Sequence, residues 1–341
     1  MNLYKNLSFP LLKKLDAEHA HDRTLTALSW GQRFAPYMLR HIAGDLPVDP
    51  VVLFGLTFPN AIGMAAGFDK EACVVRGLAM LGFGHIEVGT LTPKRQAGNP
   101  RPRIFRLPED DGLINRMGFP NKGVKTAVYN LTTLPTDRDY IIGVSIGKQK
   151  ETPLANAADD YLTVMQAVYP YADYLAVNIS SPNTPGLREL QGKNYLRHLL
   201  AQLQSENDVL SINQKRKPLL VKIAPDLTWA ELDEILEAIS DEGVDGIIAT
   251  NTALSRDGVR GKNRDEAGGL SGRPLRERST AVIRYISERT NGRLPIIGVG
   301  GISTVADVEE KLEAGASLVQ LYSGMVYEGP GLVGRLVRNN E

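Results

Sequence analysis

Residues 219–250, LLVKIAPDLTWAELDEILEAISDEGVDGIIAT, decide the fold because they contain one complete strand–helix–strand unit. Leu219–Ile223 and Gly246–Thr250 are short apolar runs without polar alternation, which is typical of strands buried on both faces. Ala230–Ile239, between them, carries its apolar residues at helical spacing. The unit therefore predicts two parallel strands joined by a helix.

The same alternation of strand and helix patterns continues along the chain from about residue 53 onward. A further helical stretch of this kind is Val305–Ala314. Eight units imply a parallel sheet that closes into a (β/α)8 TIM barrel, although a doubly wound open sheet also fits the alternation. The eight predicted strands are Ala61–Ala65, His85–Gly89, Ile141–Ile146, Tyr174–Ile179, Leu219–Ile223, Gly246–Thr250, Ile296–Val299 and Leu318–Leu321.

The first 50 residues follow a different pattern, and the 341-residue chain is longer than the roughly 250 residues that a barrel needs. A leucine recurs every fourth residue near the N-terminus, which predicts an amphipathic helix that Pro10 breaks or bends. Asp16 is suited to cap a second helix running towards Trp30. We therefore expect an N-terminal helical extension over residues 1–50 and a barrel over residues 51–341. The apolar stripe consists of Leu3, Leu7, Leu11 and Leu15 with Tyr4 and Leu12 beside them, and Phe34, Tyr37 and Met38 extend the apolar face.

This extension has two interpretations. It is either a helix pair packed on its own barrel or an apolar mouth that dips into a lipid interface. No stretch approaches the roughly 18 consecutive apolar residues that span a bilayer. Lys5, Lys13 and Lys14 interrupt any secretory signal at the N-terminus, so we expect a cytoplasmic protein that is still able to lie on a membrane surface.

Composition excludes several other classes of protein. Lys+Arg and Asp+Glu are both 39, and this neutral balance argues against a nucleic-acid partner. Cys73 is the single cysteine, so the chain forms no internal disulfide and no cysteine-ligated iron–sulfur cluster. The five histidines lack the spacing of metal ligands, and no metal site is predicted. Ser181 is not in a GxSxG elbow, which disfavours hydrolase chemistry.

Polar residues or glycines follow all eight predicted strands, which is where a barrel builds its active site. They would converge on one mouth and form a small-molecule site. Gly300 and Gly301, after the seventh strand, suit a phosphate-bearing ligand because loops there bind phosphate through backbone N–H groups. The segments are Ala65–Lys70, Gly89-Thr90, Ser145–Lys148, Asn178–Thr184, Lys222, Thr250–Thr252, Gly298–Gly301 and Tyr322–Gly324.

Two lysines at these strand ends carry alternative interpretations. Lys222 stands in an apolar run, where it forms either an internal salt bridge or a cation facing developing negative charge. Lys70 forms either a local surface pair with Asp69 or part of the site. Several asparagines converge on the same mouth and indicate an amide-rich or carboxylate-bearing ligand: Asn115, Asn178, Asn183 and Asn251.

Six motifs, which follow one another in a fixed order, are spread over essentially the whole chain. With them the sequence resembles the dihydroorotate dehydrogenases, and specifically their quinone-dependent class. The motifs are Ala65-Ala66-Gly67-Phe68-Asp69-Lys70, Asn115-Arg116-Met117-Gly118-Phe119, Asn178-Ile179-Ser180-Ser181-Pro182-Asn183-Thr184-Pro185-Gly186, Val221-Lys222-Ile223-Ala224-Pro225-Asp226, Gly268-Gly269-Leu270-Ser271-Gly272 and Gly298-Val299-Gly300-Gly301-Ile302.

The resemblance implies one FMN per chain at the barrel mouth. It assigns the flavin contacts to Ala66, Gly67, Phe68, Asp69, Lys70, Thr90, Ser145, Asn178, Lys222, Thr250, Gly272, Gly301, Tyr322 and Ser323. It assigns the dihydroorotate/orotate contacts to Lys70, Asn115, Arg116, Met117, Gly118, Phe119, Asn178, Asn183, Asn251 and Thr252. One departure is visible, since the family usually has asparagine where this chain has Ser145, and the flavin contact of that residue is therefore open.

The resemblance also implies a mechanism, in which (S)-dihydroorotate is oxidised to orotate in de novo pyrimidine (UMP) biosynthesis. Ser181 would remove the C5 proton while a hydride moves from C6 to flavin N5. Thr184 and an ordered water would relay the proton, because a free serine is a poor base. Lys70 would hold the substrate carboxylate, and Lys222 would stabilise the reduced, anionic ring.

The quinone class is implied by the helical extension and by Ser181, because soluble relatives use cysteine as the base. His21 and Arg106 match positions near the quinone, against the alternatives of a surface histidine and a loop salt bridge. The expected partners are a membrane quinone and a lipid surface met by the N-terminal helices, with no nucleic acid and no obligate protein partner. The expected location is the cytoplasmic face of the cell membrane. Competing interpretations are another FMN barrel that reduces pyrimidine rings and a non-enzymatic membrane-surface protein.

Overall fold

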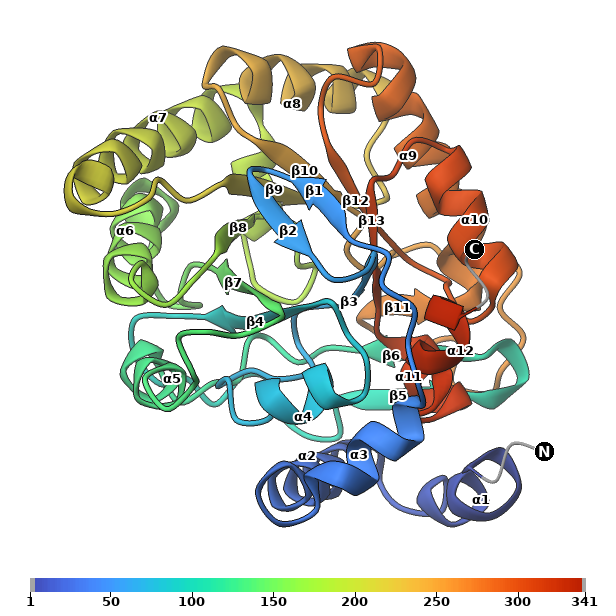
Figure 1. The fold of residues 1–341 in the computed structure, drawn as a ribbon. Helices are drawn as coiled ribbons and strands as arrows, with labels where there is room; N and C mark the ends of the chain where they lie inside the picture. Colours follow the sequence, from blue (N-terminus) through green and yellow to red (C-terminus); the bar gives the residue numbers. More distant parts are fainter. Residues whose placement is uncertain (1–3, 339–341) are drawn as a thin grey trace.

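The computed structural model describes residues 4–338, and its centre is a closed barrel of eight parallel strands (Figure 1). Closure excludes the open, doubly wound sheet. Each predicted strand is present, with bounds that differ from the prediction by at most two residues at either end. Around the ring the order is β10 (Gly246–Ala249), β12 (Ile296–Val299), β13 (Leu318–Leu321), β3 (Ile62–Met64), β4 (His85–Leu91), β7 (Ile141–Ile146), β8 (Tyr174–Asn178) and β9 (Leu219–Ile223).

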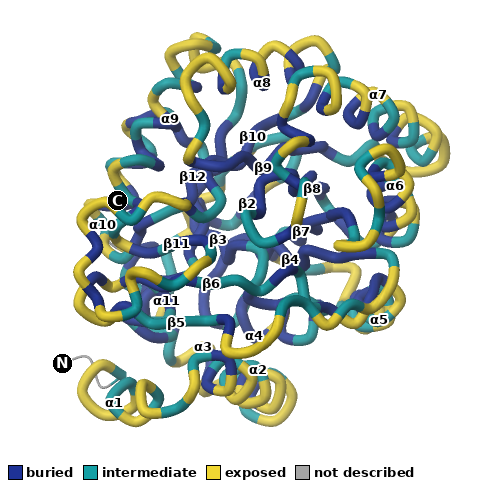
Figure 2. Tube along the Cα trace, turned by 180° about the vertical axis from the view of Figure 1, so that it is seen from behind, coloured by how far each residue is buried: buried dark blue, intermediate teal, exposed yellow. Residues whose placement is uncertain are grey.

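Helices surround the strands, with exposed outer faces and buried inner faces (Figure 2). Two of them begin with a capping box, in which Thr228 is paired with Glu231 and Thr304 with Asp307. The helices after the first barrel strand are α4 (Val75–Met80), α5 (Val124–Leu131), α6 (Ala157–Val168), α7 (Lys193–Leu210), α8 (Trp229–Asp241), α9 (Arg276–Thr290), α10 (Val305–Glu313), α11 (Ser323–Glu328) and α12 (Leu332–Arg338). Short 3-10 turns occupy Pro108–Asp110, Leu154–Asn156, Leu187–Gln191, Ser211–Asn213 and Arg273–Leu275.

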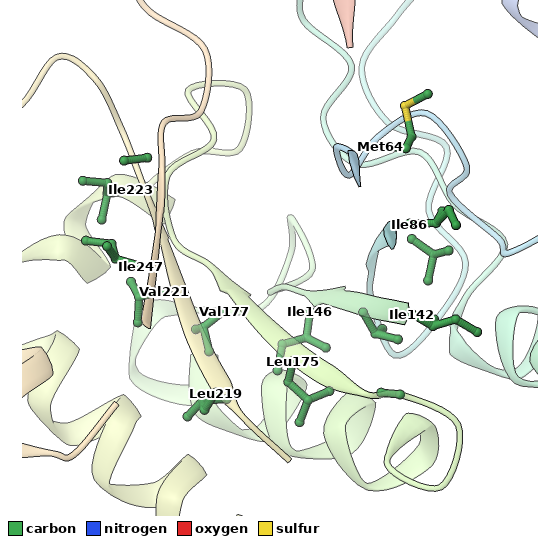
Figure 3. Packing of buried hydrophobic residues seen from close by; sticks show 14 of the residues in the cluster. Met64, Ile86, Ile142, Ile146, Leu175, Val177, Leu219, Val221, Ile223 and Ile247 are labelled. Atoms are coloured by element: carbon green, nitrogen blue, oxygen red, sulfur yellow. The ribbon is translucent and has the colours of Figure 1, made fainter. Parts of the chain in front are cut away.

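The strands are apolar on both faces because two separate cores meet them. One core lies between barrel and helices and includes Ile142, Leu175 and Val221 (Figure 3). The other fills the barrel itself and includes Leu220 and Ile248. This double burial is the physical reason that continuous apolar runs, rather than alternating ones, identified the strands.

A hairpin of β1 (Val51–Leu53) and β2 (Leu56–Phe58) closes the N-terminal end of the barrel and packs on the inner core (Figure 1). Above it, two large polar side chains point inwards, His85 and Tyr174. Each needs a glycine on a neighbouring strand, because a Cβ at Gly63 would overlap the His85 ring and one at Gly143 would overlap Tyr174. The interior of the barrel is therefore packed rather than hollow.

A three-stranded antiparallel sheet was not anticipated from the sequence. It consists of β5 (Ile104–Leu107), β6 (Gly112–Asn115) and β11 (Gly269–Gly272), in the order β11-β6-β5. Because β5 and β6 come from the segment after β4, and β11 from the segment after β10, the sheet joins two distant loops. It lies at the C-terminal end of the barrel, where it contributes to the cavity described below.

The N-terminal extension consists of a π-helical turn Tyr4–Ser8, α1 (Phe9–Leu12), α2 (Ala17–Phe34) and α3 (Pro36–Ala43). Leu3 lies outside the described residues. Pro10 stands in the first turn of α1, just after the change from π- to α-helix, so the stripe is interrupted there as expected. Asp16 caps α2, where its Oδ1 accepts hydrogen bonds from Glu18 N and His19 N at 3.0 Å each.

The extension is fixed to the barrel by α2. Gln32 on α2 donates a hydrogen bond to the Cys73 carbonyl at 2.8 Å and accepts one from Gly77 N. Buried Glu18 pairs with Arg103, just before β5, at 2.7 Å. None of the described helices is long and apolar enough to cross a bilayer.

Candidate active site

One cavity of about 1080 Å³ lies at the C-terminal ends of the barrel strands and continues outwards between α1, α2 and α3. Its inner part, the polar half, is lined by strand ends and by the β5-β6-β11 sheet. Its outer part, the apolar half, is lined by helix residues that include Phe9, Leu12, Leu28, Trp30, Met38 and Leu39. A cavity of this size holds more than one small molecule.

The charges that reach this cavity are all of one sign. Lys70 and Lys222 line the polar half, and Arg106 and Arg23 line the part nearer the helices. No aspartate or glutamate among residues 4–338 is part of its wall. The cavity therefore suits ligands that carry phosphate or carboxylate groups.

The predicted asparagines converge in the polar half as two linked pairs. Asn178 Nδ2 donates to Thr90 Oγ1 at 2.8 Å, and Asn251 Nδ2 donates to Asn178 Oδ1 at 3.4 Å. Asn183 Nδ2 donates to Asn115 Oδ1 at 3.3 Å. All five side chains line the cavity. Amide groups arranged in this way offer donors and acceptors to a ring that carries amides of its own.

Ser181 lies in the wall of the polar half, on the loop after β8, and is nearly buried. Its Oγ accepts a hydrogen bond from Asn183 N at 3.2 Å. Thr184, one turn further along, is buried, and its Oγ1 has no hydrogen-bond partner within the described chain. A buried hydroxyl without a hydrogen-bond partner is a place where an ordered water would bind.

Lys70 does not form a surface pair with Asp69, so that alternative is wrong. The Asp69 carboxylate is buried and accepts hydrogen bonds from Cys73 N at 2.8 Å and Val74 N at 2.7 Å. The Lys70 ammonium donates to the Gly67 carbonyl at 2.7 Å and faces the cavity. Burial lowers the pKa of Lys70, while the nearby acids Glu71, Glu18, Asp22 and Asp69 act in the opposite direction.

Lys222 forms the internal salt bridge that the sequence left open, and it also lines the cavity. Its partner is Glu87 on β4, whose Oε1 lies 3.3 Å from Lys222 Nζ. Sequence reasoning missed Glu87. The signal for it was a second buried charge in an apolar strand, since an inward-facing carboxylate in a barrel needs a cation.

A glycine-rich recess forms the end of the polar half near β11 and β13. Gly301 has φ 76° and Gly272 has φ 95°, and a Cβ at either position would overlap neighbouring chain. Ser271 and Ser323 flank the recess with their Oγ atoms 2.8 Å apart. Ser271 is a further residue that the sequence reasoning did not select. Close backbone approach with two hydroxyls suits a phosphate group.

His21 and Arg106 both line the cavity where the apolar half meets the polar half. The His21 ring packs edge-on against Phe68 with ring centroids 5.2 Å apart. Burial, with Lys70 nearby, lowers the pKa of His21 to about 3, so its imidazole is neutral at physiological pH. Arg106 Nη1 donates to the Leu15 carbonyl at 2.8 Å, which ties β5 to the start of α2.

Four of the predicted site residues lie outside the cavity wall, whereas the other predicted site residues line it. Asp69 and Thr184 are buried and do not line it. Arg116 pairs with Glu266 at 2.7 Å and stacks on Phe105, so its guanidinium is held elsewhere. Ser145 is buried, and its Oγ lies 2.9 Å from Thr90 Oγ1, which itself reaches the cavity.

Comparison with known proteins agrees with this geometry. Residues 50–339 match the family model for dihydroorotate dehydrogenase. A Dichelobacter nodosus protein named dihydroorotate dehydrogenase (quinone) is 52% identical over 335 residues, which cover 98% of this chain and 97% of that protein. A Marinomonas protein of the same name is 50% identical, with 98% of this chain and 96% of that protein covered.

Among solved structures, the chain is similar to DHODH from Eimeria tenella. The complex with ferulenol superimposes with a TM-score of 0.84 at 39% identity and covers 94% of this chain and 89% of that one. The ligand-free form superimposes with a TM-score of 0.81 at 41% identity and covers 89% and 92% of the two chains. Sequence and fold agree over nearly the full length, and the chain belongs to the dihydroorotate dehydrogenase family.

Proposed function

We propose that this protein is a dihydroorotate dehydrogenase of the quinone class, which oxidises (S)-dihydroorotate to orotate in de novo pyrimidine (UMP) biosynthesis. The observation that carries the proposal is one continuous cavity with two chemically different halves. Its cationic, amide-rich half suits a flavin and a small carboxylate, and its apolar half suits a quinone. We expect one FMN per chain as cofactor.

The residues present fit an FMN. The recess of Gly272, Gly301 and Ser323 suits its phosphate, and Lys222 supplies a buried cation for the ring. Ala66, Gly67, Phe68, Thr90, Asn178, Thr250 and Tyr322 complete the proposed cofactor wall. A bound flavin supplies a two-electron acceptor for the hydride that dihydroorotate loses from C6. Because Ser145 and Asp69 do not reach the cavity, we propose that they act through Thr90 and the Lys70 loop instead.

The substrate would be held by the neighbouring part of the polar half. Lys70 supplies the cation for the carboxylate, and the asparagine pairs supply donors and acceptors for the ring amides. Met117, Gly118, Phe119 and Thr252 provide the surrounding wall. Holding the substrate between fixed donors aligns its C5–H bond with a base in the wall.

We assign the base to Ser181, which would take the C5 proton while C5=C6 forms. A serine hydroxyl needs a further acceptor, because its alkoxide is negligible at neutral pH. Thr184 Oγ1, buried and unpartnered in the described chain, is suited to hold a water that carries the proton onwards. Lys70 and the asparagines would stabilise the negative charge that develops as C5 loses its proton.

The N-terminal helices form the proposed route for a quinone, with residues 1–50 as the membrane-facing extension and residues 51–341 as the catalytic domain. His21 and Arg106 stand at the junction between the two halves of the cavity. Leu7, Leu11, Trp30, Phe34, Tyr37 and Met38 are large apolar residues of this extension that are more than half exposed. Such a surface suits peripheral docking on a lipid bilayer, which we propose occurs at its cytoplasmic face, without an obligate protein partner.

An anaerobic spectral titration tests this function. Purified protein is mixed with dihydroorotate, and the visible absorbance of the flavin should bleach. Addition of a short-chain quinone should then restore the absorbance, whereas NAD should not. Reoxidation of the flavin by NAD and not by the quinone would overturn the assignment to the quinone class. A protein that is purified without flavin and binds none when flavin is added would overturn the assignment as an enzyme.

A further inference from the structure

Glu87 lies inside the barrel, fully buried, directly behind the wall of the polar half. Its Oε1 lies 3.3 Å from Lys222 Nζ. Its Oε2 accepts hydrogen bonds from Gln320 Nε2 at 2.9 Å and from the Tyr174 hydroxyl at 3.2 Å. The carboxylate thus receives three donors from three strands, β9, β13 and β8.

These contacts form two layers. Lys222 and Gln320 line the cavity, whereas Glu87 and Tyr174 do not. The space for Tyr174 comes from Gly143, since any side chain there would overlap the tyrosine ring. Strand β7 therefore leaves room for a hydroxyl to reach a carboxylate that has no contact with the cavity.

A buried carboxylate is costly unless it is paired and hydrogen-bonded, and this one is both. All three partners offer donors, which matches an ionised carboxylate because that group only accepts. Burial raises the pKa of Tyr174 well above its usual value, and the charge of Glu87 raises it further, so the phenol remains a donor. Lys222 is thereby held at one place in the wall with its positive charge partly offset.

We propose that Glu87 is a positioning residue that, through Lys222, sets the reduction potential of the flavin bound in this cavity. The inference rests on the proposed function. Lys222 attracts the reduced, anionic form of the flavin, and the carboxylate behind it weakens that attraction. The strength of the ion pair therefore determines how readily the flavin gives up its electrons.

The test is the flavin reduction potential of the Glu87→Gln holoprotein, measured by anaerobic reduction against a reference dye. The amide keeps the shape but removes the negative charge, so Lys222 stabilises reduced flavin more strongly. We expect the potential to rise by about 30 mV, which is a tenfold shift in the two-electron equilibrium. The matched control is Tyr174→Phe, which removes one donor from the same carboxylate without removing its charge, and a much smaller shift is expected. An unchanged potential in Glu87→Gln, or an equal shift in Tyr174→Phe, would overturn the proposal.

The same Glu87 substitution made in a Lys222→Met variant tests whether Glu87 acts on the flavin potential through Lys222 or directly. Lys222→Met removes the cation through which Glu87 is proposed to act, so adding Glu87→Gln in that variant should change the potential by less than half as much. If Glu87→Gln shifts the flavin potential in the Lys222→Met variant as much as it does in the wild-type protein, the positioning role is overturned. If Glu87→Gln does not fold, Glu87→Asp replaces it, because it withdraws the charge by one methylene. A smaller rise is then expected, and no rise contradicts the proposal.

The flavin content of the wild-type protein distinguishes failure of the proposed function from failure of the proposed role of Glu87. Wild-type protein that holds no flavin refutes the proposed function. Flavin-loaded Glu87→Gln with the potential of the wild type refutes the role of Glu87 and leaves the proposed function intact.

Discussion

At the scale of single residues, Ser181 stands out because its hydroxyl lies in the cavity wall with one hydrogen bond, from Asn183 N. As the proposed base it should contribute about 10²–10⁴-fold to the rate of substrate oxidation. We therefore expect Ser181→Ala to slow flavin bleaching by dihydroorotate by about that factor in stopped-flow experiments. The flavin content should remain unchanged, because the hydroxyl is not needed for the phosphate recess. A variant that bleaches at the wild-type rate would remove Ser181 from the mechanism.

His85 leads to a prediction about stability. Both ring nitrogens are buried without a hydrogen-bond partner in the described chain, and burial lowers the pKa of His85 to about 3. Between that value and the unfolded pKa of about 6.5, the unfolded chain binds more protons than the folded one. The contribution of His85 to stability is therefore fully present above about pH 6.5 and is lost as the pH falls towards 3. Its slope is at most about 1.4 kcal/mol per pH unit.

The variant His85→Leu should flatten this slope in denaturant titrations between pH 4.5 and 6.5, a range that lies between the folded and unfolded pKa values. Phe58→Leu is the control, because Phe58 packs edge-on against the same ring at 5.4 Å and does not titrate. It should lower stability equally across the window. An unaltered slope in His85→Leu would mean that the buried ring does not resist protonation.

The sequence could predict Lys222 but not what it binds. A lysine in an apolar strand indicates a buried charge. Its internal salt bridge was one of two alternatives, the other being a cation that faces developing negative charge. Its partner comes from β4, far away in the chain, so only closure of the barrel brings Glu87 and Lys222 together. For Arg116 the sequence motif predicted a substrate contact that the position of its side chain does not support. It lies within a recognised motif, yet Glu266 and Phe105 hold its guanidinium outside the cavity wall.

At the scale of elements, the eight strands could be predicted because double burial gives each a continuous apolar run. The β5-β6-β11 sheet could not, since its strands are only four residues each and β11 pairs with β6 across a long stretch of chain. The N-terminal helices were predicted from spacing and from the cap at Asp16. Which of their faces remains exposed depended on packing against α4 and α12, and the sequence alone did not determine it.

That exposed face carries the next prediction. Phe34 and Tyr37 are 62% and 83% exposed, lie at the junction of α2 and α3, and do not line the cavity. If the extension docks on lipid, replacing both with serine removes on the order of 2 kcal/mol of apolar burial per residue. We expect Phe34→Ser with Tyr37→Ser to lower affinity for phospholipid vesicles at least about tenfold in cosedimentation.

The matched control for this pair is Tyr129→Ser, because Tyr129 is 71% exposed but lies on α5, away from the extension. Its vesicle binding should equal that of the wild type. Bleaching of the flavin by dihydroorotate in solution should be unaffected in the double variant and in the control. Undiminished binding by the double variant would mean that this face does not meet the bilayer.

At the scale of the whole molecule, the cavity is where separate parts of the chain depend on one another. Its polar half is built from strand ends distributed between β3 and β13, and its apolar half from residues between Tyr4 and Ile42. The sequence could predict convergence of the strand ends, because parallel strands in a barrel end at one mouth. It could not predict how the two halves join, which depends on Arg106 bridging β5 to Leu15.

A ligand that contacts so many strands should stabilise the whole fold. Binding to the folded state alone adds about 4 kcal/mol at a thousandfold excess over Kd, which raises the melting temperature on the order of 5 °C for a domain of this size. We expect FMN to produce this rise when it is added to protein stripped of flavin. Riboflavin, which lacks the phosphate, should give a much smaller rise because it leaves the recess near Gly301 unused.

The variant Ser323→Ala tests whether the phosphate of FMN binds in that recess, because it removes the Ser323 hydroxyl. Its hydroxyl lies 2.8 Å from Ser271 Oγ, so its loss removes one donor to the phosphate without adding bulk. The gap between FMN and riboflavin in melting temperature should therefore narrow in Ser323→Ala, while the melting temperature of the flavin-free protein stays near the wild-type value. If riboflavin stabilised the wild type as well as FMN does, the phosphate would bind elsewhere, and the glycine-rich recess would have only a structural role.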